Sequence, residues 1–413
     1  MEKYPEAVVA MAGGRDYYQL PLALIEGDLL CRLVTDFYFP ADKAFFSRFV
    51  GGMLSRQLIS TRFCEGLPSC RVALSRHALL TAVLMKFAPR LKLDRVKDTA
   101  LSVQARRVAT KAQAALLCYS YYASEAFKDG EDRPRYRFLF QLHPDPTIVR
   151  EILSEELVRT HCGNNSLIRE HELSLPMKQF EALAAEPHLA NGIIVASTYT
   201  ANTLRDRGIV NCPIHVVPYG VDSSLFPSTD KKETTDRPFT VLFVGSLVQR
   251  KGLSYLLDSI RIINTRQIKV VLCGRGYVDK QLLASYADIP LELKIGLSRA
   301  EVVAQMHNSD MFVLPSLAEG FGHVILEAMS CALPVVATPH SCAPDVIKDG
   351  ATGFIVPIRN AEALAERIDW GLTHRAQLCA MGQDAAVQAR LFTWSRFRSR
   401  IREVYKELIA SVE

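Results

Sequence analysis

The chain alternates short apolar runs with longer helical patterns, and it does so in two separate series. The first series opens with EAVVAMAGG, YYQLPLALIEGDLL and CRLVTDFYF, which read as strand, helix and strand within residues 6–39. The runs ALLCYSYYAS, RYRFLFQLH and NGIIVAST supply further strands, and residues 40–115 are expected to be mostly helical. Parallel strands need a crossover connection, usually a helix, so this alternation predicts a parallel α/β sheet.

The second series covers residues 239–357. Its strand patterns are FTVLFVGS, IKVVLCGRG, LELKIG, MFVLPS, PVVAT and FIVP. Helices are expected from Leu253, near Lys280, over 299–307 and after Gly322. Two such series predict two doubly wound, Rossmann-like domains that face each other across a cleft, because ligands of these sheets bind beyond the carboxyl ends of the strands.

The boundary between the two domains is expected in PSTDKKETTDRP, residues 227–238, a polar stretch bounded by prolines. A chain of 413 residues exceeds what one hydrophobic core usually supports. We therefore predict a first domain over residues 1–226 and a second over 239–391. A last helix, over residues 392–413, is expected to pack back on the first domain.

Composition excludes several classes of protein. Hydrophobic residues make up 49% of the chain and charged residues 23%, which is typical of a globular and not a disordered protein. No apolar run predicts a transmembrane helix, and MEKYPEAVVAMAGG reads as a first strand and not as a signal peptide. The ten cysteines form no Cys-x-x-Cys pair, so we expect reduced thiols, a cytoplasmic protein and no zinc site.

Positive charge is concentrated between Lys43 and Lys111, where fourteen lysines and arginines stand against three acids. Such a block attracts anions. Two interpretations stay open from the sequence. The block is either the solvated outer face of several helices or a surface that meets an anionic partner.

The segment LPSLAEGFGHVILEAM, residues 314–329, joins a strand end, a glycine turn and a helix. Gly320 and Gly322 let a ligand approach the backbone, and a helix that begins near Gly322 directs unpaired N–H groups toward it. Glu319 and Glu327 flank this turn. An anion is the ligand that such a helix start favours, and two merely solvated glutamates are the alternative.

This Glu-x7-Glu pattern resembles the signature of the retaining glycosyltransferases of family four, which have the GT-B fold. FVGSLVQRKG, LPVVAT and DGATGFIVP stand in the order usual in that family across residues 239–367, and VVPYGVDSSLF and FTWSRFRSRIREVYKEL fit as well. The resemblance implies an acceptor-side first domain and a donor-binding second domain. It also implies that a sugar moves from a nucleoside diphosphate sugar to an acceptor hydroxyl with retention of configuration.

The resemblance assigns roles to the residues around the glycine turn. Glu327 would hold the ribose hydroxyls of the donor, and Glu319 would hold hydroxyls of the donor sugar. The diphosphate would lie at the positive end of the helix. The residues expected to bind the donor there are Phe321, Gly322, His323 and Val324.

Lys251 corresponds to the phosphate-binding lysine of the family, whose ammonium would neutralise charge on the departing diphosphate. The family commonly has an arginine five residues earlier, where this chain has Ser246. Either Arg250 or a residue of the other domain then supplies the second positive charge, or stabilisation of the leaving group is weaker. A surface lysine at a helix start is the alternative for Lys251.

His143, in QLHPDP, would lie near the donor phosphate or sugar hydroxyls, where an imidazole could hydrogen-bond or relay a proton. A structural histidine before a proline turn is the alternative. Gly13 and Gly14 end the first strand and would face the donor phosphates across the cleft. Gly274 and Gly276 are expected to end another strand and pass beneath the base. Ordinary turns are the alternative for both pairs.

The resemblance implies front-face attack without a protein nucleophile, and without a metal or other cofactor. The expected partners are the nucleotide-sugar donor and a saccharide or lipid-linked acceptor, with no nucleic acid. The basic block suggests an anionic acceptor or a peripheral stay at the inner face of a membrane, in polysaccharide, glycolipid or glycoconjugate synthesis. A non-catalytic sugar-nucleotide-binding protein, a phosphorylase and an epimerase remain alternatives.

Overall fold

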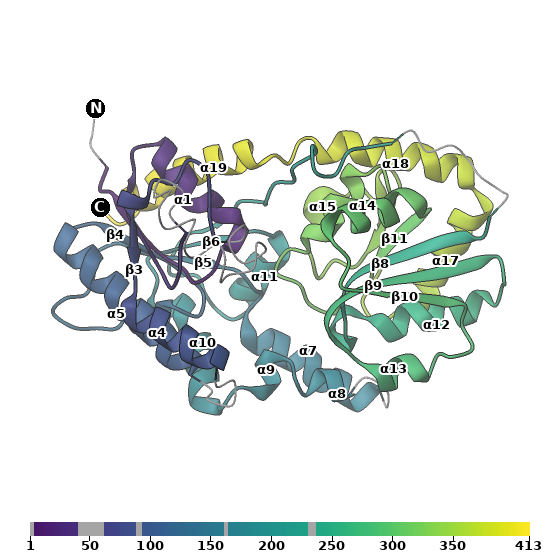
Figure 1. The fold of residues 1–413 in the computed structure, drawn as a ribbon, viewed down its shortest axis with the longest axis horizontal. Helices are drawn as coiled ribbons and strands as arrows, with labels where there is room; N and C mark the ends of the chain where they lie inside the picture. The colour runs from purple at the N-terminus through teal and green to yellow at the C-terminus, as the bar shows by residue number, and fades with distance from the viewer. Residues whose placement is uncertain (1–3, 40–61, 88–92, 161–163, 230–236) are drawn as a thin grey trace.

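Two parallel sheets form the framework of the protein in the computed structural model, which describes residues 4–39, 62–87, 93–160, 164–229 and 237–413 (Figure 1). The strands of the first sheet are β1 (Ala7–Ala10), β2 (Leu30–Thr35), β3 (Val72–Leu74), β4 (Ala115–Tyr119), β5 (Arg137–Gln141), β6 (Gly192–Val195) and β7 (Ile214–Val216). Their order is β3-β2-β1-β4-β5-β6-β7, and all neighbours are parallel. The chain therefore reverses its direction of winding between β1 and β4.

Helices connect these strands on both faces of the sheet. They are α1 (Gln19–Glu26), α4 (Arg76–Phe87), α5 (Asp94–Ala112), α6 (Ala123–Ala126), α7 (Pro146–Arg159), α8 (Asn164–Leu167), α9 (His171–Ser174), α10 (Met177–Leu189) and α11 (Thr198–Asp206). The Asp145 carboxylate caps α7 by accepting from Thr147 N and Ile148 N, and Pro146 occupies the first turn. The first sheet and these helices are called the N-terminal lobe below.

One part of the first series differs from the prediction. Residues 72–74 form the edge strand β3, although 40–115 were expected to be mostly helical. The strand has only three residues, and within the described part of the chain it pairs with β2 alone. Its short pattern is hidden between longer helical ones. Five of the fourteen basic residues of the block that begins at Lys43 lie in residues 40–61 and 88–92, outside the described residues.

The second sheet repeats the same winding. Its strands are β8 (Phe239–Leu247), β9 (Ile268–Val278), β10 (Leu291–Ile295), β11 (Met311–Leu314), β12 (Val335–Ala337) and β13 (Gly353–Ile355), in the order β10-β9-β8-β11-β12-β13. Its helices are α12 (Leu253–Ile263), α13 (Lys280–Ala284), α14 (Arg299–Asn308), α15 (His323–Ser330), α16 (Ala343–Val346), α17 (Ala361–Thr373) and α18 (Arg375–Ala389). The chain reverses its winding between β8 and β11. This sheet and its helices are called the C-terminal lobe.

Strand β9 is longer than its pattern predicts. It was expected to end at Gly274 and Gly276, but it continues to Val278 because Leu247 pairs with Val278 after an irregularity in the ladder. Gly274 lies inside the sheet. A Cβ atom there would come within 2.8 Å of the Leu247 and Ile295 side chains, so glycine is needed for packing at this position.

The last helix, α19 (Trp394–Ala410), leaves the C-terminal lobe and packs on α1 of the N-terminal lobe (Figure 1). Tyr405 donates a hydrogen bond to Pro5 O at 2.6 Å, and Leu408 packs so tightly on Gly192 that a Cβ atom at Gly192 would lie 2.3 Å from it. At the crossing, Val221 N donates to Phe392 O at 2.9 Å. Both ends of the described chain thus belong to the N-terminal lobe.

Most residues of the inner strands of both sheets are buried on both faces, as parallel sheets covered by helices require, whereas the strands β3, β7 and β10 are partly exposed. Cys118 and Cys273 lie in such strands, and the cysteines of the described residues are all free thiols. Within the same residues, no helix combines the length and the apolar character needed to cross a bilayer. The expected linker at 227–238 falls partly outside the described residues, at 230–236.

Candidate active site

The loop after β11 brings the two lobes into direct contact. A Cβ atom at Gly320 would lie 1.9 Å from the Leu142 carbonyl oxygen, so only glycine permits this approach. The Gly320 carbonyl accepts hydrogen bonds from Ser197 Oγ at 2.6 Å and Thr200 Oγ1 at 3.1 Å, both at the start of α11. The loop that carries Glu319 is therefore held against the end of β5, where His143 follows.

Glu319 is buried beside the cations of the C-terminal lobe. Its Oε1 atom forms an ion pair with Lys251 Nζ, accepts from Ser316 Oγ at 3.1 Å and lies 4.0 Å from Arg250 Nη1. The sequence placed Glu319 and Lys251 in one site, and the structure brings the two side chains into contact. Each of these two side chains neutralises the charge of the other.

Lys251 and Arg250 belong to a 3₁₀ turn, Gln249–Lys251, which we call the QRK turn. Burial lowers the pKa of the Lys251 ammonium well below its usual value and the Arg250 guanidinium acts in the same direction. Arg250 Nε donates to Glu170 at 2.8 Å, and its Nη1 donates to Ala318 O at 2.8 Å. Arg250 is thus engaged by protein groups on both sides.

His143 lies at the end of β5 with its ring against Tyr121, at 5.6 Å between ring centroids. The pKa of His143 is lowered to about 3, chiefly by burial and also by the nearby charges of Arg250 and Arg15. The imidazole is therefore neutral at physiological pH. It has one donor and one acceptor nitrogen to offer a ligand.

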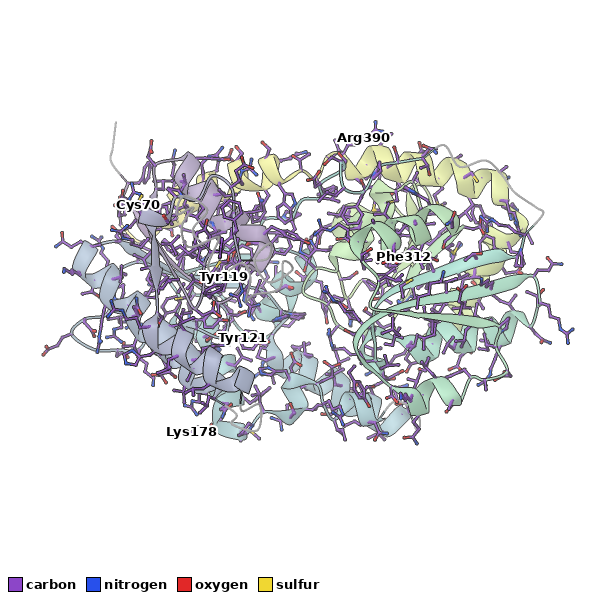
Figure 2. All side chains as sticks on the ribbon, viewed as in Figure 1. Cys70, Tyr119, Tyr121, Lys178, Phe312 and Arg390 are labelled. Atoms are coloured by element: carbon purple, nitrogen blue, oxygen red, sulfur yellow. The ribbon has the colours of Figure 1, made fainter. Side chains whose placement is uncertain are left out.

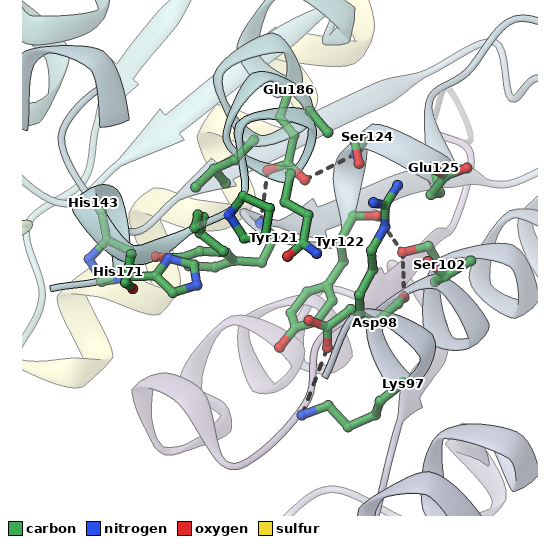
Figure 3. Close-up of a pocket in the computed structure, with 18 of the residues that line it drawn as sticks. Lys97, Asp98, Ser102, Tyr121, Tyr122, Ser124, Glu125, His143, His171 and Glu186 are labelled. Carbon is green, nitrogen blue, oxygen red and sulfur yellow. Dashed lines mark hydrogen bonds and ion pairs between the residues drawn. The ribbon is translucent and has the colours of Figure 1, made fainter. Parts of the chain in front are cut away.

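A cavity of about 770 Å³ opens beside His143 in the N-terminal lobe (Figure 3). Its lining includes Arg15, Lys97, Tyr121, Tyr122, His171 and Glu186. Tyr121 lies on the inner side of the N-terminal lobe, whereas the core residue Phe312 marks the opposite sheet (Figure 2). A cavity of this size, with aromatic and polar walls, can hold a sugar-sized molecule.

Arg15 is the residue of this cavity that the sequence reasoning missed. Its Nη2 donates to the Tyr122 hydroxyl at 3.3 Å, and its buried Nε has no hydrogen-bond partner among the described residues. The signal in the sequence was its position directly after Gly13 and Gly14. Arginine is common at surfaces, so that position alone did not distinguish it.

Glu186 supports the wall of the cavity from α10. Its carboxylate accepts from Tyr121 N at 2.8 Å, Ala123 N at 2.9 Å and Ser124 N at 3.0 Å (Figure 3). Burial raises its pKa to about 7. Tyr121 has a φ angle of 82°, a strained conformation for a side-chain-bearing residue, and this carboxylate stabilises it.

Glu327 lies in a second, smaller cavity of about 230 Å³ between the lobes. Tyr17, Arg299, His323 and Trp394 also line it. Burial raises the pKa of Glu327 to about 7, and the Arg299 charge opposes that shift. Glu327 thus lines this cavity, whereas Glu319 is buried against Lys251.

The start of α15 separates the two glutamates. Gly322 is the N-cap with a φ of 87°, and it provides no side-chain cap, so the first N–H groups of the helix point at the loop. Phe321 is buried, and His323 stacks on Tyr219 with 4.6 Å between ring centroids. Burial lowers the pKa of His323 to about 4. Val324 occupies the first turn of the helix and is partly buried.

Gly13 and Gly14 follow β1, as the sequence predicted. The Gly13 N–H donates to the Asp36 carboxylate at 3.0 Å, and Asp36 also accepts from Phe37 N and Arg62. The Gly13 amide is thus already engaged within the N-terminal lobe. Among the described residues, no group of three or more histidines, cysteines and acids has the arrangement of a metal site.

Comparisons with known proteins show the family to which the chain belongs. Residues 227–388 match the family described as glycosyl transferases group 1. An uncharacterized glycosyltransferase of Methanocaldococcus jannaschii is 30% identical over 262 residues, which cover 63% of this chain and 71% of that protein. The chain belongs to the group 1 glycosyltransferases. It spans about half the length of several other curated relatives that it matches.

Solved structures show that this group 1 glycosyltransferase has the GT-B fold. Sucrose-phosphate synthase from Thermosynechococcus elongatus superposes with a TM-score of 0.66 at 18% identity, over 99% of this chain and 100% of that one. Anabaena HepE, solved in complex with UDP and glucose, superposes with a TM-score of 0.56 at 15% identity, over 98% and 100% of the two chains. The fold predicted from the sequence is confirmed.

Replacement of Glu327 by glutamine should stabilise the free protein at alkaline pH. The pKa of Glu327 is raised in the folded state, so the folded protein holds a proton that the unfolded chain releases between about pH 4.5 and 7. The wild type therefore loses stability as pH rises through that window, and the neutral amide of Glu327→Gln does not. The difference in Tm between variant and wild type should grow from pH 5 to pH 8.

Glu366→Gln, on the exposed side of α17, is the control. An equal difference at both pH values would contradict the burial of Glu327.

Proposed function

We propose that this enzyme is a retaining glycosyltransferase of family four, which transfers a sugar from a nucleoside diphosphate sugar to an acceptor hydroxyl. The observation that carries the proposal is the arrangement at the carboxyl edge of the second sheet. There Lys251, Glu319 and the uncapped start of α15 surround one point opposite His143. A cation, a helix start and a carboxylate are the groups that a diphosphate and a sugar ring require.

The donor would displace the ion pair between Lys251 and Glu319. Lys251 would then neutralise the diphosphate, and Glu319 would accept hydrogen bonds from the sugar hydroxyls. Glu327, in the second cavity, would bind the ribose. Because this assignment uses both cavities, the nucleoside would lie near α15 and the transferred sugar near His143.

The reaction proposed is front-face attack. The bond between the anomeric carbon and the diphosphate oxygen breaks with its electron pair on the phosphate. The acceptor oxygen forms the new bond on the same face and releases its proton to that phosphate. No protein nucleophile takes part, so the enzyme contributes position, exclusion of water and stabilisation of the departing charge. The neutral His143 imidazole would donate a hydrogen bond in this site.

A panel of UDP-, GDP- and ADP-sugars should contain one that raises the melting temperature of the protein, since a ligand that binds only the folded state stabilises it. Glu327→Ala should lose most of that shift, because the ribose hydroxyls lose their acceptor. The product formed from the stabilising donor should keep the anomeric configuration in proton NMR spectra. Donor turnover with inversion would contradict the proposed mechanism, and no shift with any donor would contradict the proposed function.

The second positive charge at the diphosphate is proposed to come from Arg15. Arg250 is already bound by Glu170 and Ala318, whereas Arg15 has a buried Nε without a partner among the described residues. It lies in the cavity beside His143, and its charge acts on the His143 imidazole together with those of Arg250 and Lys251. The other lobe would thus replace the arginine that the chain lacks at Ser246.

Lys251→Ala and Arg15→Ala should each lower kcat by roughly 10²- to 10³-fold, as the loss of one group that stabilises developing charge does elsewhere. Each variant would be measured with the donor selected by the melting experiment. Arg150→Ala is the matched control, because Arg150 lies on α7 and stacks on Phe180 away from the cavity. Near-normal turnover of either variant would remove that residue from the mechanism.

We further propose that the face formed by α4 and α5 contacts an anionic membrane, which would give access to a lipid-linked acceptor. Leu80, Leu84 and Val96 are exposed there, at 59%, 43% and 54%. Arg76, Arg95 and Arg107 line a cavity of about 760 Å³ between the same helices. Exposed apolar side chains and arginines on the same two helices match the chemistry of a bilayer surface that carries negative charge.

The protein should therefore sediment with vesicles that contain phosphatidylglycerol and remain in solution with vesicles of phosphatidylcholine alone. Leu80→Glu should reduce the bound fraction roughly fivefold or more, because it replaces an apolar contact by repulsion from the anionic surface. Val158→Glu, at an exposed position of α7, is the control. Equal binding of wild type and Leu80→Glu would contradict this surface.

A further inference from the structure

A completely buried carboxylate joins the two lobes on the side of the molecule where α7 and α8 extend beneath the C-terminal lobe (Figure 1). Glu156, on α7, is 0% exposed. Its neighbour Glu155 is on the same helix with a side chain that is 62% exposed. Buried carboxylates are costly unless they are fully hydrogen-bonded, so the surroundings of Glu156 need an explanation.

Every hydrogen-bond donor that the structure gives the Glu156 carboxylate comes from the other lobe. Oε1 accepts from Gln249 Nε2 at 2.8 Å and from the Tyr255 hydroxyl at 2.9 Å. Oε2 accepts from Arg359 Nε at 2.9 Å. The carboxylate is therefore satisfied only while the lobes are together. When they separate, water must replace three protein donors.

Gln249 is the first residue of the QRK turn. Its side chain is fixed at both ends, since Oε1 accepts from Ser254 N at 3.2 Å while Nε2 donates to Glu156 and to Ser254 Oγ. Its backbone N donates to Ser166 Oγ, on α8, at 3.1 Å. The next residue, Arg250, is bound by Glu170. Three residues of the N-terminal lobe thus hold the turn that carries Lys251.

We infer that Glu156 is a positioning residue, which holds the QRK turn through Gln249 and so couples closure of the lobes to the placement of the Lys251 ammonium. The inference rests on the proposed function, in which Lys251 binds the diphosphate. Glu156 touches neither substrate. It acts because its buried carboxylate supplies a charged acceptor that fixes the first side chain of the turn.

Two variants distinguish the role of Glu156 in the contact between the lobes from its role in holding the QRK turn. Glu156→Gln keeps the shape of the side chain but replaces one acceptor oxygen by an NH2 group. This group cannot accept a hydrogen bond from the donors that surround it. The variant should loosen both the lobe contact and the turn. Gln249→Ala removes only the link to the turn, because Tyr255 and Arg359 still bind Glu156. Glu155→Ala is the control for both, since Glu155 binds Arg359 but not the turn.

The first measurement is small-angle X-ray scattering of the free protein. Glu156→Gln should increase the radius of gyration, whereas Gln249→Ala and Glu155→Ala should match the wild type. An unchanged radius in Glu156→Gln would overturn the inference whatever the protein catalyses, because no ligand is involved. Circular dichroism and thermal melting of each variant distinguish separation of the lobes from unfolding.

The second measurement is binding of inorganic pyrophosphate by calorimetry. Glu156→Gln and Gln249→Ala should each weaken it roughly 10- to 100-fold, the usual effect of losing a hydrogen bond to a charged group, and Glu155→Ala should not. In turnover with the selected donor, both should lower kcat more than they raise KM. Unchanged affinity in both variants would overturn the positioning role. If the wild type binds no pyrophosphate, the proposed function fails, and the scattering result still decides the lobe contact.

Discussion

The approach of two backbones at Gly320 is the constraint on which the geometry of the site depends. A side chain there would collide with the Leu142 carbonyl, so the Glu319 loop can lie against the end of β5 only because residue 320 is glycine. The hydroxyls of Ser197 and Thr200 complete the contact by satisfying the Gly320 carbonyl. Lys251 and His143, which are far apart in the sequence, lie close enough in this arrangement for the Lys251 charge to lower the pKa of His143.

The site around His143 collects positive charge. Arg15, Arg250 and Lys251 all act on its imidazole, and the carboxylates that compensate them are Glu170 and Glu319. Burying several cations away from water is unfavourable unless negative charges compensate them. Because the His143 imidazole is neutral, it adds no further positive charge to the site. An entering anion would therefore gain from an electrostatic field that the folded protein has already established, and little reorganisation would be needed.

The sequence predicted what depends on neighbouring residues, and it missed what depends on distant ones. The resemblance to the family placed Lys251 and Glu319 in one site, and their ion pair was not predicted. The two winding series and the helix start after Gly322 follow from local pattern and spacing. The length of β9 did not, because pairing with β8 continues past glycines that usually end a strand. β3 was hidden because three residues are too few to show a period.

Residues whose role depends on contacts with distant parts of the chain could not be predicted for a different reason. Arg15 becomes notable only when the fold places it beside His143. Glu156 reads as one more acid on an amphipathic helix until Gln249, Tyr255 and Arg359 surround it from the other lobe. Nothing in the residues next to it distinguishes it from Glu155. A contact between lobes is a property of tertiary structure, and a single sequence carries no direct record of it.

The return of α19 to the N-terminal lobe gives the molecule two covalent crossings between lobes instead of one. The crossings run side by side, since Val221 N bonds to Phe392 O and a Cβ atom at Gly220 would strike the backbone of Trp394. Two adjacent crossings restrict twisting and sliding of one lobe against the other. They still allow the lobes to rotate about the line that joins the two crossings. Helix α7, which carries Glu156, lies on the opposite side of the molecule from these crossings (Figure 1). A small rotation of the lobes about that line would therefore produce a large displacement at the Glu156 carboxylate.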